Sequence, residues 1–116
     1  MMRTMLKSKI HRCRVTEANL YYEGSITVDS ALLAKADILP GEKVEVLNLN
    51  TGVRLETYAI EGKRNSGIIC LNGPAARNAC VGDQVIILSY FLVADQDAKS
   101  VKAKVVKVNE RNRIKN

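Results

Sequence analysis

The chain has 116 residues and a mass of 12.8 kDa, a length that fits one domain and excludes a two-domain enzyme. Its 47% hydrophobic and 26% charged residues are typical of a globular protein with a core of its own. No apolar stretch approaches the roughly 20 residues that cross a bilayer, and no hydrophobic stretch follows the basic start as in a signal peptide. We therefore expect a cytoplasmic protein with no membrane partner.

Short strands separated by turns dominate the chain. Alternation over residues 4–15 predicts a first strand, with Lys7 and Lys9 on one face and Ile10 on the other. Further strands are expected over residues 26–28, 44–49, 53–60, 67–71, 85–90 and 101–108. Two short helices are expected between them. Asp29 is the N-cap of the first, and Pro74 opens the second, which runs through Ala79.

An internal repeat organises these elements. In each copy a short helix is followed by a turn and a strand, reading Leu39-Pro40-Gly41-Glu42-Lys43-Val44 first and Cys80-Val81-Gly82-Asp83-Gln84-Val85 second. Glycine can take a backbone shape closed to other residues, and a β-branched strand follows in both copies. Two matching half-units in a strand-rich chain suggest a closed barrel with internal pseudo-symmetry, although coincidence between two ordinary turns is the alternative.

The formal charge of +6 is concentrated at the end of the chain. Residues 99–116 hold seven Lys or Arg against Glu110 alone, whereas residues 1–98 hold 11 basic and 11 acidic side chains. Proteins that track nucleic acid usually add aromatic stacking platforms, but the chain has no Trp and its one Phe lies outside this segment. We therefore expect a solvated tail and no nucleic-acid partner, with a nucleic-acid-binding barrel as the rival interpretation.

The three cysteines, Cys13, Cys70 and Cys80, have no C-x-x-C spacing, which argues against a disulfide framework or a zinc site. We expect three buried thiols. The common catalytic motifs of hydrolases, nucleotide-binding enzymes and metalloproteases are missing, and one histidine with scattered acids gives no metal cluster. A Gly24-Ser25 pair by itself is an ordinary turn signal.

Taken together, short pieces along the chain resemble the pyruvoyl-dependent aspartate 1-decarboxylases, bacterial enzymes that make β-alanine for pantothenate. The pieces are Arg3-Thr4-Met5-Leu6, Lys9, His11, Val15-Thr16, Tyr22-Glu23-Gly24-Ser25, Thr57-Tyr58-Ala59-Ile60, Asn72-Gly73, Ala75-Ala76 and Val81-Gly82-Asp83. They share one register from residue 1 to about residue 90. The resemblance implies a mainly β fold, a double-psi β-barrel with short helices, in a single domain spanning residues 1–116. It also implies a homotetramer.

The resemblance further implies a cofactor made from the chain itself. Decarboxylation of an amino acid needs an electron sink, which no unmodified side chain provides. The Ser25 hydroxyl would attack the Gly24 carbonyl, cleaving the chain into residues 1–24 and 25–116 and leaving a pyruvoyl group at residue 25. Strain at a glycine and an oxyanion donor such as Thr57 would assist. The reaction would convert L-aspartate to β-alanine and CO₂.

The resemblance assigns catalysis to Ser25 and Tyr58, and self-processing to Gly24, Ser25 and Thr57. It assigns substrate binding to Lys9, Arg54, Thr57, Asn72, Gly73, Pro74 and Ala75. His11 and Tyr22 are assigned supporting roles.

Two of these assignments agree with strand geometry. Arg54 is the expected carboxylate clamp, because its planar fork binds two oxygens at once. Tyr58, the family's proton donor, lies two residues further along the same strand face. Pro74 departs from the alanine common in the family and has no N–H to offer a substrate.

Each assignment has a structural alternative. Arg54 can pair with Glu56 or Glu45 across a hairpin, while Tyr58, Lys9 and His11 can be plain core or surface residues. A related decarboxylase with another acidic substrate also remains open.

Overall fold

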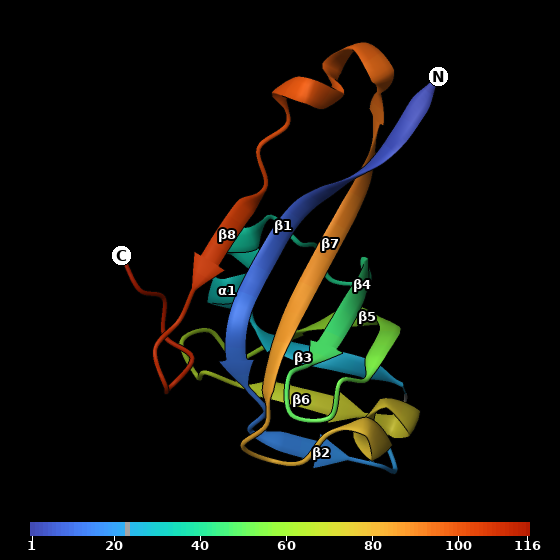
Figure 1. Cartoon of the computed structure of the whole chain (residues 1–116). Helices are drawn as coiled ribbons and strands as arrows, with labels where there is room; N and C mark the ends of the chain where they lie inside the picture. The colour runs from blue at the N-terminus through green and yellow to red at the C-terminus, as the bar shows by residue number, and fades with distance from the viewer. Residues whose placement is uncertain (23) are drawn as a thin grey trace.

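The computed structural model describes residues 1–22 and 24–116; Glu23, part of the Tyr22–Ser25 motif, lies outside the described residues. The described residues form strands β1 (Met2–Arg14), β2 (Glu17–Asn19), β3 (Ser25–Asp29), β4 (Lys43–Asn48), β5 (Arg54–Gly62), β6 (Ile69–Asn72), β7 (Gln84–Ala94) and β8 (Lys104–Lys107) (Figure 1). Between them lie α1 (Ser30–Ala36) and the 3₁₀ helices η1 (Gly73–Asn78) and η2 (Asp95–Ser100). No helix among these residues is long and apolar enough to span a membrane.

The strands close into a barrel. Their order in the sheet is β2-β6-β3-β5-β4-β7-β1-β8. Only Val15 and Thr16 separate β1 from β2, so one continuous stretch of chain joins the two sides of the sheet. The Thr16 N–H donates to Ile69 O at 2.8 Å, and the Val15 N–H donates to Asp83 O at 2.9 Å. The closed wall surrounds a core of fully buried aliphatic side chains such as Ile26 and Ile87.

The predicted repeat is confirmed at the level of hydrogen bonds. Gly41 (φ +88°) and Gly82 (φ +95°) both take the left-handed conformation that favours glycine. The Gly41 N–H donates to Ala59 O at 2.7 Å and the Ala59 N–H donates back to Glu42 O, while Gly82 and Asp83 make the same exchange with Val15. The two interlocked halves form the predicted double-psi β-barrel.

Helix α1 begins where the sequence predicts. The Asp29 carboxylate accepts hydrogen bonds from the N–H groups of Ala31, Asn65 and Gly67, each at 2.9 Å. It therefore caps the helix and holds the loop before β6. The helix buries Leu32 and Leu33 against the core, as expected from their spacing.

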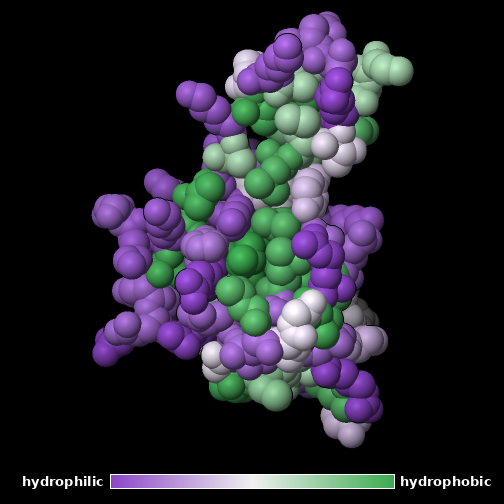
Figure 2. All heavy atoms as spheres, in the orientation of Figure 1, coloured by the Kyte–Doolittle hydropathy of each residue, from purple (hydrophilic) through white to green (hydrophobic). Residues whose placement is uncertain are grey.

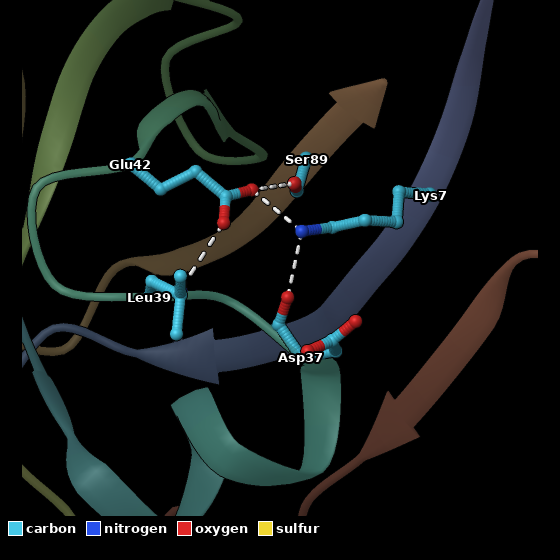
Figure 3. Close-up of polar contacts among 5 residues, drawn as sticks. All are labelled: Lys7, Asp37, Leu39, Glu42 and Ser89. Atoms are coloured by element: carbon cyan, nitrogen blue, oxygen red, sulfur yellow. Dashed lines mark hydrogen bonds and ion pairs between the residues drawn. The ribbon is translucent and has the colours of Figure 1, made fainter. Parts of the chain in front are cut away.

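A half-buried ion pair fixes the turn after α1 to the barrel wall. Lys7 Nζ of β1 donates to Glu42 Oε2 at 2.7 Å and to Asp37 O at 2.6 Å (Figure 3). Ser89 Oγ of β7 also donates to Glu42 Oε2, and the Leu39 N–H donates to Glu42 Oε1 at 3.1 Å. One carboxylate thus links β1, β7 and the turn.

The end of the chain corrects the prediction of a solvated tail. Strand β8 pairs in parallel with β1, and the Asn112 side chain is buried. Asn112 accepts from the Arg14 N–H and donates to Arg14 O and Gly67 O, each at 2.8 Å. The Lys and Arg side chains of residues 99–116 are exposed, but their backbone belongs to the fold.

Other differences are local. Strand β2 and the 3₁₀ helix η2 were not predicted. Strand β7 extends to Ala94 rather than ending at Tyr90, and β8 is shorter than the expected 101–108. The prediction of three buried thiols is wrong for Cys80, which is exposed in the turn before β7; Cys13 and Cys70 are buried. The direct neighbours of Cys80 are Ala79 and Val81, and these apolar residues gave no sign that its thiol is exposed.

Candidate active site

Ser25 and Asn72 face each other at the paired ends of β3 and β6. Their exposures are 0% and 3%, so both polar side chains are removed from solvent. Asn72 Nδ2 donates to Ser25 Oγ and to Thr27 Oγ1, each at 2.9 Å. Burial raises the pKa of Cys70 to about 11, so its thiol stays protonated. The thiol donates a hydrogen bond to Asn72 Oδ1, with the sulfur 3.2 Å from the oxygen. The Asn72 amide is therefore held in one orientation, with a donor on the Ser25 hydroxyl.

Gly73 lets the backbone approach the Gly24-Ser25 bond closely. Its φ of +60° is the left-handed conformation, and a Cβ atom there would lie 2.7 Å from Tyr22 O and 2.9 Å from Gly24 Cα. No side chain larger than hydrogen fits without moving the segment before Ser25. A Cβ on Gly24 would be 3.5 Å from Pro74 Cδ, so the proline ring also lies next to Gly24.

A pocket of about 390 Å³ opens beside this bond. Its lining consists of Gly24, Leu55, Glu56, Thr57, Tyr58, Pro74, Ala75 and Asn78. Strand β5 runs parallel to β3 with Ala59 opposite Ile26, so Thr57 and Tyr58 lie level with the residues just before Ile26. The Tyr58 side chain is 39% exposed. The structure therefore brings four of the predicted residues, Thr57, Tyr58, Pro74 and Ala75, into one pocket with Gly24.

Arg54 pairs with Glu45 across the β4–β5 hairpin, one of the two partners expected for it from the sequence. Its Nη1 donates to Glu45 Oε1 at 2.8 Å, and Tyr90 OH donates to the same oxygen at 2.8 Å. Burial and the Glu45 charge raise the pKa of Tyr90, which keeps this phenol protonated. The Arg54 side chain is 60% exposed, so its ion pair with Glu45 contributes only about 0–1 kcal/mol to stability. An incoming carboxylate can therefore replace Glu45 as the partner of Arg54.

Lys9 and His11 lie on β1, which β5, β4 and β7 separate from β3 in the sheet. Neither belongs to the described lining of the pocket beside Gly24, nor does Arg54. Burial and the nearby charges of Lys9, Arg12 and Lys107 lower the pKa of His11. One chain thus places these three predicted residues on other parts of the barrel surface than the Ser25 cluster.

Two neighbours of the site were not singled out from the sequence. Thr27 shares the Asn72 amide with Ser25, and Glu56 places a carboxylate in the pocket lining. Period-two alternation puts Thr27 on the face of Ser25, so the signal for it was present. Glu56 lies between Arg54 and Tyr58 on one exposed face of β5. Its charge was the only feature of the sequence that could have marked it as a site residue.

Comparison with known proteins places the chain in a family. A family described as Aspartate decarboxylase matches residues 1–115. "Aspartate 1-decarboxylase" of Thermoanaerobacter pseudethanolicus is 59% identical over 97% of this chain and 97% of its own length. The protein of the same description from Listeria monocytogenes is 56% identical over 98% of this chain and 90% of its own.

Among solved structures, a rationally designed protein, mkDPBB_sym_86, is similar with a TM-score of 0.49 and 20% identity, over 68% of this chain and 91% of that chain. The family match and the two relatives extend over nearly all 116 residues. The chain belongs to the aspartate decarboxylase family of enzymes.

Proposed function

We propose that the chain is a cytoplasmic, pyruvoyl-dependent decarboxylase that converts L-aspartate to β-alanine and CO₂ for pantothenate biosynthesis. The observation that carries the proposal is the buried Ser25 hydroxyl, which accepts a hydrogen bond from Asn72. The preceding residue, Gly24, lines a pocket together with Thr57 and Tyr58. Family membership supplies the reaction class.

Maturation would begin at the Gly24-Ser25 peptide bond. Ser25 Oγ attacks the Gly24 carbonyl carbon, the C–N bond breaks, and the acyl group is transferred to oxygen as an ester. Elimination then releases the Gly24 carboxylate, and addition of water with loss of ammonia leaves the pyruvoyl carbonyl. The products are residues 1–24 and residues 25–116.

The residues present fit this route. A donor already bonded to Ser25 Oγ fixes the rotamer of the nucleophile. The backbone of Gly73 packs closely against Gly24, where a Cβ atom on residue 73 would lie 2.9 Å from Gly24 Cα. We assign Thr57, on the pocket side, as a hydrogen-bond donor to the developing oxyanion.

In the mature enzyme the pyruvoyl group would supply the electron sink that loss of CO₂ requires. Asn72, held in one orientation, would donate to its carbonyl oxygen. Tyr58 lines the pocket and would deliver a proton from its hydroxyl. The N–H groups of Gly73 and Ala75 would donate to a substrate carboxylate, whereas Pro74 has none.

The cations proposed to bind the negatively charged carboxylates of the substrate lie outside the Ser25 cluster. Arg54 would exchange Glu45 for a substrate carboxylate, and Lys9 would add positive charge, with His11 and Tyr22 in support. Since the sheet separates Lys9 from β3, an assembly is a natural way to complete the site, and we propose the homotetramer.

The surface supports assembly. Figure 2 shows apolar atoms along the face over β1 and β7. Met2 of β1 and Tyr90, Phe91 and Leu92 of β7 are exposed. Exposed apolar surface of this kind is typical of a protein–protein interface.

A decarboxylation assay tests the proposal directly. Purified, matured protein should release CO₂ and β-alanine from L-aspartate at least tenfold faster than it decarboxylates L-glutamate. Tyr58→Phe should lower kcat by about 10²-fold or more, as expected for loss of a proton donor. Tyr21→Phe, at a fully exposed tyrosine, is the matched control and should leave kcat unchanged. No product from L-aspartate in matured protein would overturn the proposal.

A further inference from the structure

A second pocket of about 550 Å³ lies at the end of β1, where the chain's last residues fold back. Four cations line it, Arg12, Arg14, Lys107 and Lys115, together with His11 and one carboxylate, Glu110. We propose that this basic pocket binds a small anion of the phosphate class that carries several negative charges, such as a diphosphate.

The fold assembles the basic pocket from segments far apart in the sequence. In the parallel register of β1 and β8, Lys107 lies opposite His11. After β8 the chain turns back through a bridge between Val108 and Ile114, and the Lys115 N–H donates to Lys107 O at 2.8 Å. The turn places Lys115 beside Lys107. Basic side chains of β1 and of the C-terminal segment thereby meet in one cavity.

Arg12 enters the pocket from an irregular point in β1. The register with β7 shifts between Ile10 and Cys13, and Arg12 takes a φ of +59°. This left-handed conformation is costly for a non-glycine residue, and bulges of this kind often redirect a side chain. Arg12 Nη2 donates to Gln84 Oε1 at 3.0 Å, a neutral acceptor that orients the guanidinium without neutralising it.

The pocket has four cations and one carboxylate in its lining, so positive charge is in excess. Among the described residues, the ion pairs within 4 Å are Arg3–Asp95, Lys7–Glu42, Lys43–Glu56 and Arg54–Glu45. The four cations of the basic pocket are in none of them. His11 Nδ1 is also buried without a hydrogen-bond partner among the described residues. This atom is out of contact with solvent, so the four exposed cations of the lining are the groups that an anion in the pocket can reach.

The size and chemistry of the lining favour a small phosphate ligand. Pockets of about 300–1,000 Å³ accommodate small molecules. Guanidinium forks and ammonium groups together match phosphate oxygens. The lining has no Phe, Tyr or Trp on which nucleobases could stack, which disfavours a single-stranded nucleic acid.

The single histidine of the chain provides the reporter for the test. The pKa of His11 is measured by proton NMR on the full-length protein during a titration with sodium pyrophosphate at constant ionic strength. Bound anion should offset the neighbouring cations and raise this pKa saturably, by roughly one unit. Inorganic phosphate should act at higher concentration because it carries less charge.

Two double variants distinguish binding of the anion in the basic pocket from a general effect of the anion on the charges of the protein surface. Arg12→Gln with Lys107→Gln should weaken pyrophosphate binding at least tenfold, whereas Lys63→Gln with Lys102→Gln removes two exposed cations elsewhere and should leave it unchanged. The absence of a saturable shift, or equal responses from both double variants, would overturn the proposal. Tighter binding of a single-stranded DNA oligonucleotide than of pyrophosphate would also overturn it, in favour of a nucleic-acid surface.

Discussion

At the scale of single residues, the candidate site depends on one buried side-chain contact. Asn72 Nδ2 holds Ser25 Oγ at 2.9 Å, and Gly73 has no room for a Cβ beside Gly24. A nucleophile is effective when its rotamer and its distance from the reacting carbonyl are fixed before reaction. The Ser25–Asn72 pair is therefore a positioning device for the peptide bond that precedes it.

Replacing Asn72 with Ala should slow self-cleavage at least tenfold, which corresponds to about 1.4 kcal/mol, the size of one hydrogen bond. The rate is followed by the appearance of fragment 25–116 on gels. Thr27→Val is the matched control, since it removes the other acceptor of the same amide and leaves the Ser25 contact in place. Equal rates for Asn72→Ala and Thr27→Val would contradict the positioning role.

The site residues were predicted unevenly. Gly24, Ser25, Thr57, Tyr58 and Asn72, which the resemblance assigned to one site, lie close together in the structure, and their catalytic roles stay predictions. The Glu45 partner of Arg54 was only one of two options, since cross-strand pairing depends on a register that the sequence leaves open.

At the scale of elements, the two related turns form the frame of the barrel. Glu42 and Asp83 occupy equivalent positions, and each accepts a hydrogen bond from the backbone N–H three residues earlier. Glu42 also binds Lys7 and Ser89, whereas Asp83 binds Asn48. The same turn is therefore joined to the wall by an ion pair in one half and by a neutral amide in the other.

Glu42→Gln should lower the free energy of unfolding by about 1–3 kcal/mol near neutral pH, because Lys7 loses its partner in a half-buried site. Burial opposes ionisation of Glu42, but the hydrogen bonds from Lys7, Ser89 and Leu39 outweigh it and lower the pKa of this carboxyl. The stabilisation is therefore fully present above the ordinary value of 4.5 and is lost as pH falls through the lower folded value.

Urea denaturation at pH 7 and pH 3 measures this effect. The difference between Glu42→Gln and the unchanged chain should shrink at the lower pH, while Glu61→Gln, at an exposed carboxylate on β5, should have little effect at either. A Glu42→Gln deficit that is the same at both pH values would show that the ion pair does not stabilise the turn.

The elements themselves were largely predictable. Alternation located β5, and Asp29 located the start of α1. Strand β8 was predicted as a strand, but its parallel pairing with β1 could not be predicted, since alternating Lys and Val residues are equally typical of a solvated segment and the pairing is set by tertiary contacts.

At the scale of the whole molecule, β1 and β7 extend beyond the barrel and carry η2 at their far end (Figure 1). Phe91 and Leu92 are exposed on this extension, with Leu92 at 67%. Burying such side chains between copies contributes about 1.5–3 kcal/mol each. The sequence alone does not reveal this surface, because exposed and buried residues of β7 are equally apolar.

Phe91→Asp with Leu92→Asp should dissociate the proposed tetramer into smaller species, as measured by analytical ultracentrifugation. Val81→Asp, at another exposed apolar residue in the turn before β7, should leave the sedimentation coefficient unchanged. A single-chain mass for the unchanged protein would contradict the assembly.

The intact mass of the protein during warm incubation tests the central claim most directly. The account predicts that the full chain is replaced by two fragments, residues 1–24 and residues 25–116, the larger one lighter by one ammonia than a chain beginning with serine. Ser25→Ala should remain uncut under the same conditions. Persistence of one uncut species, or a larger fragment with the mass of an unmodified serine terminus, would contradict self-conversion of Ser25 to a pyruvoyl group.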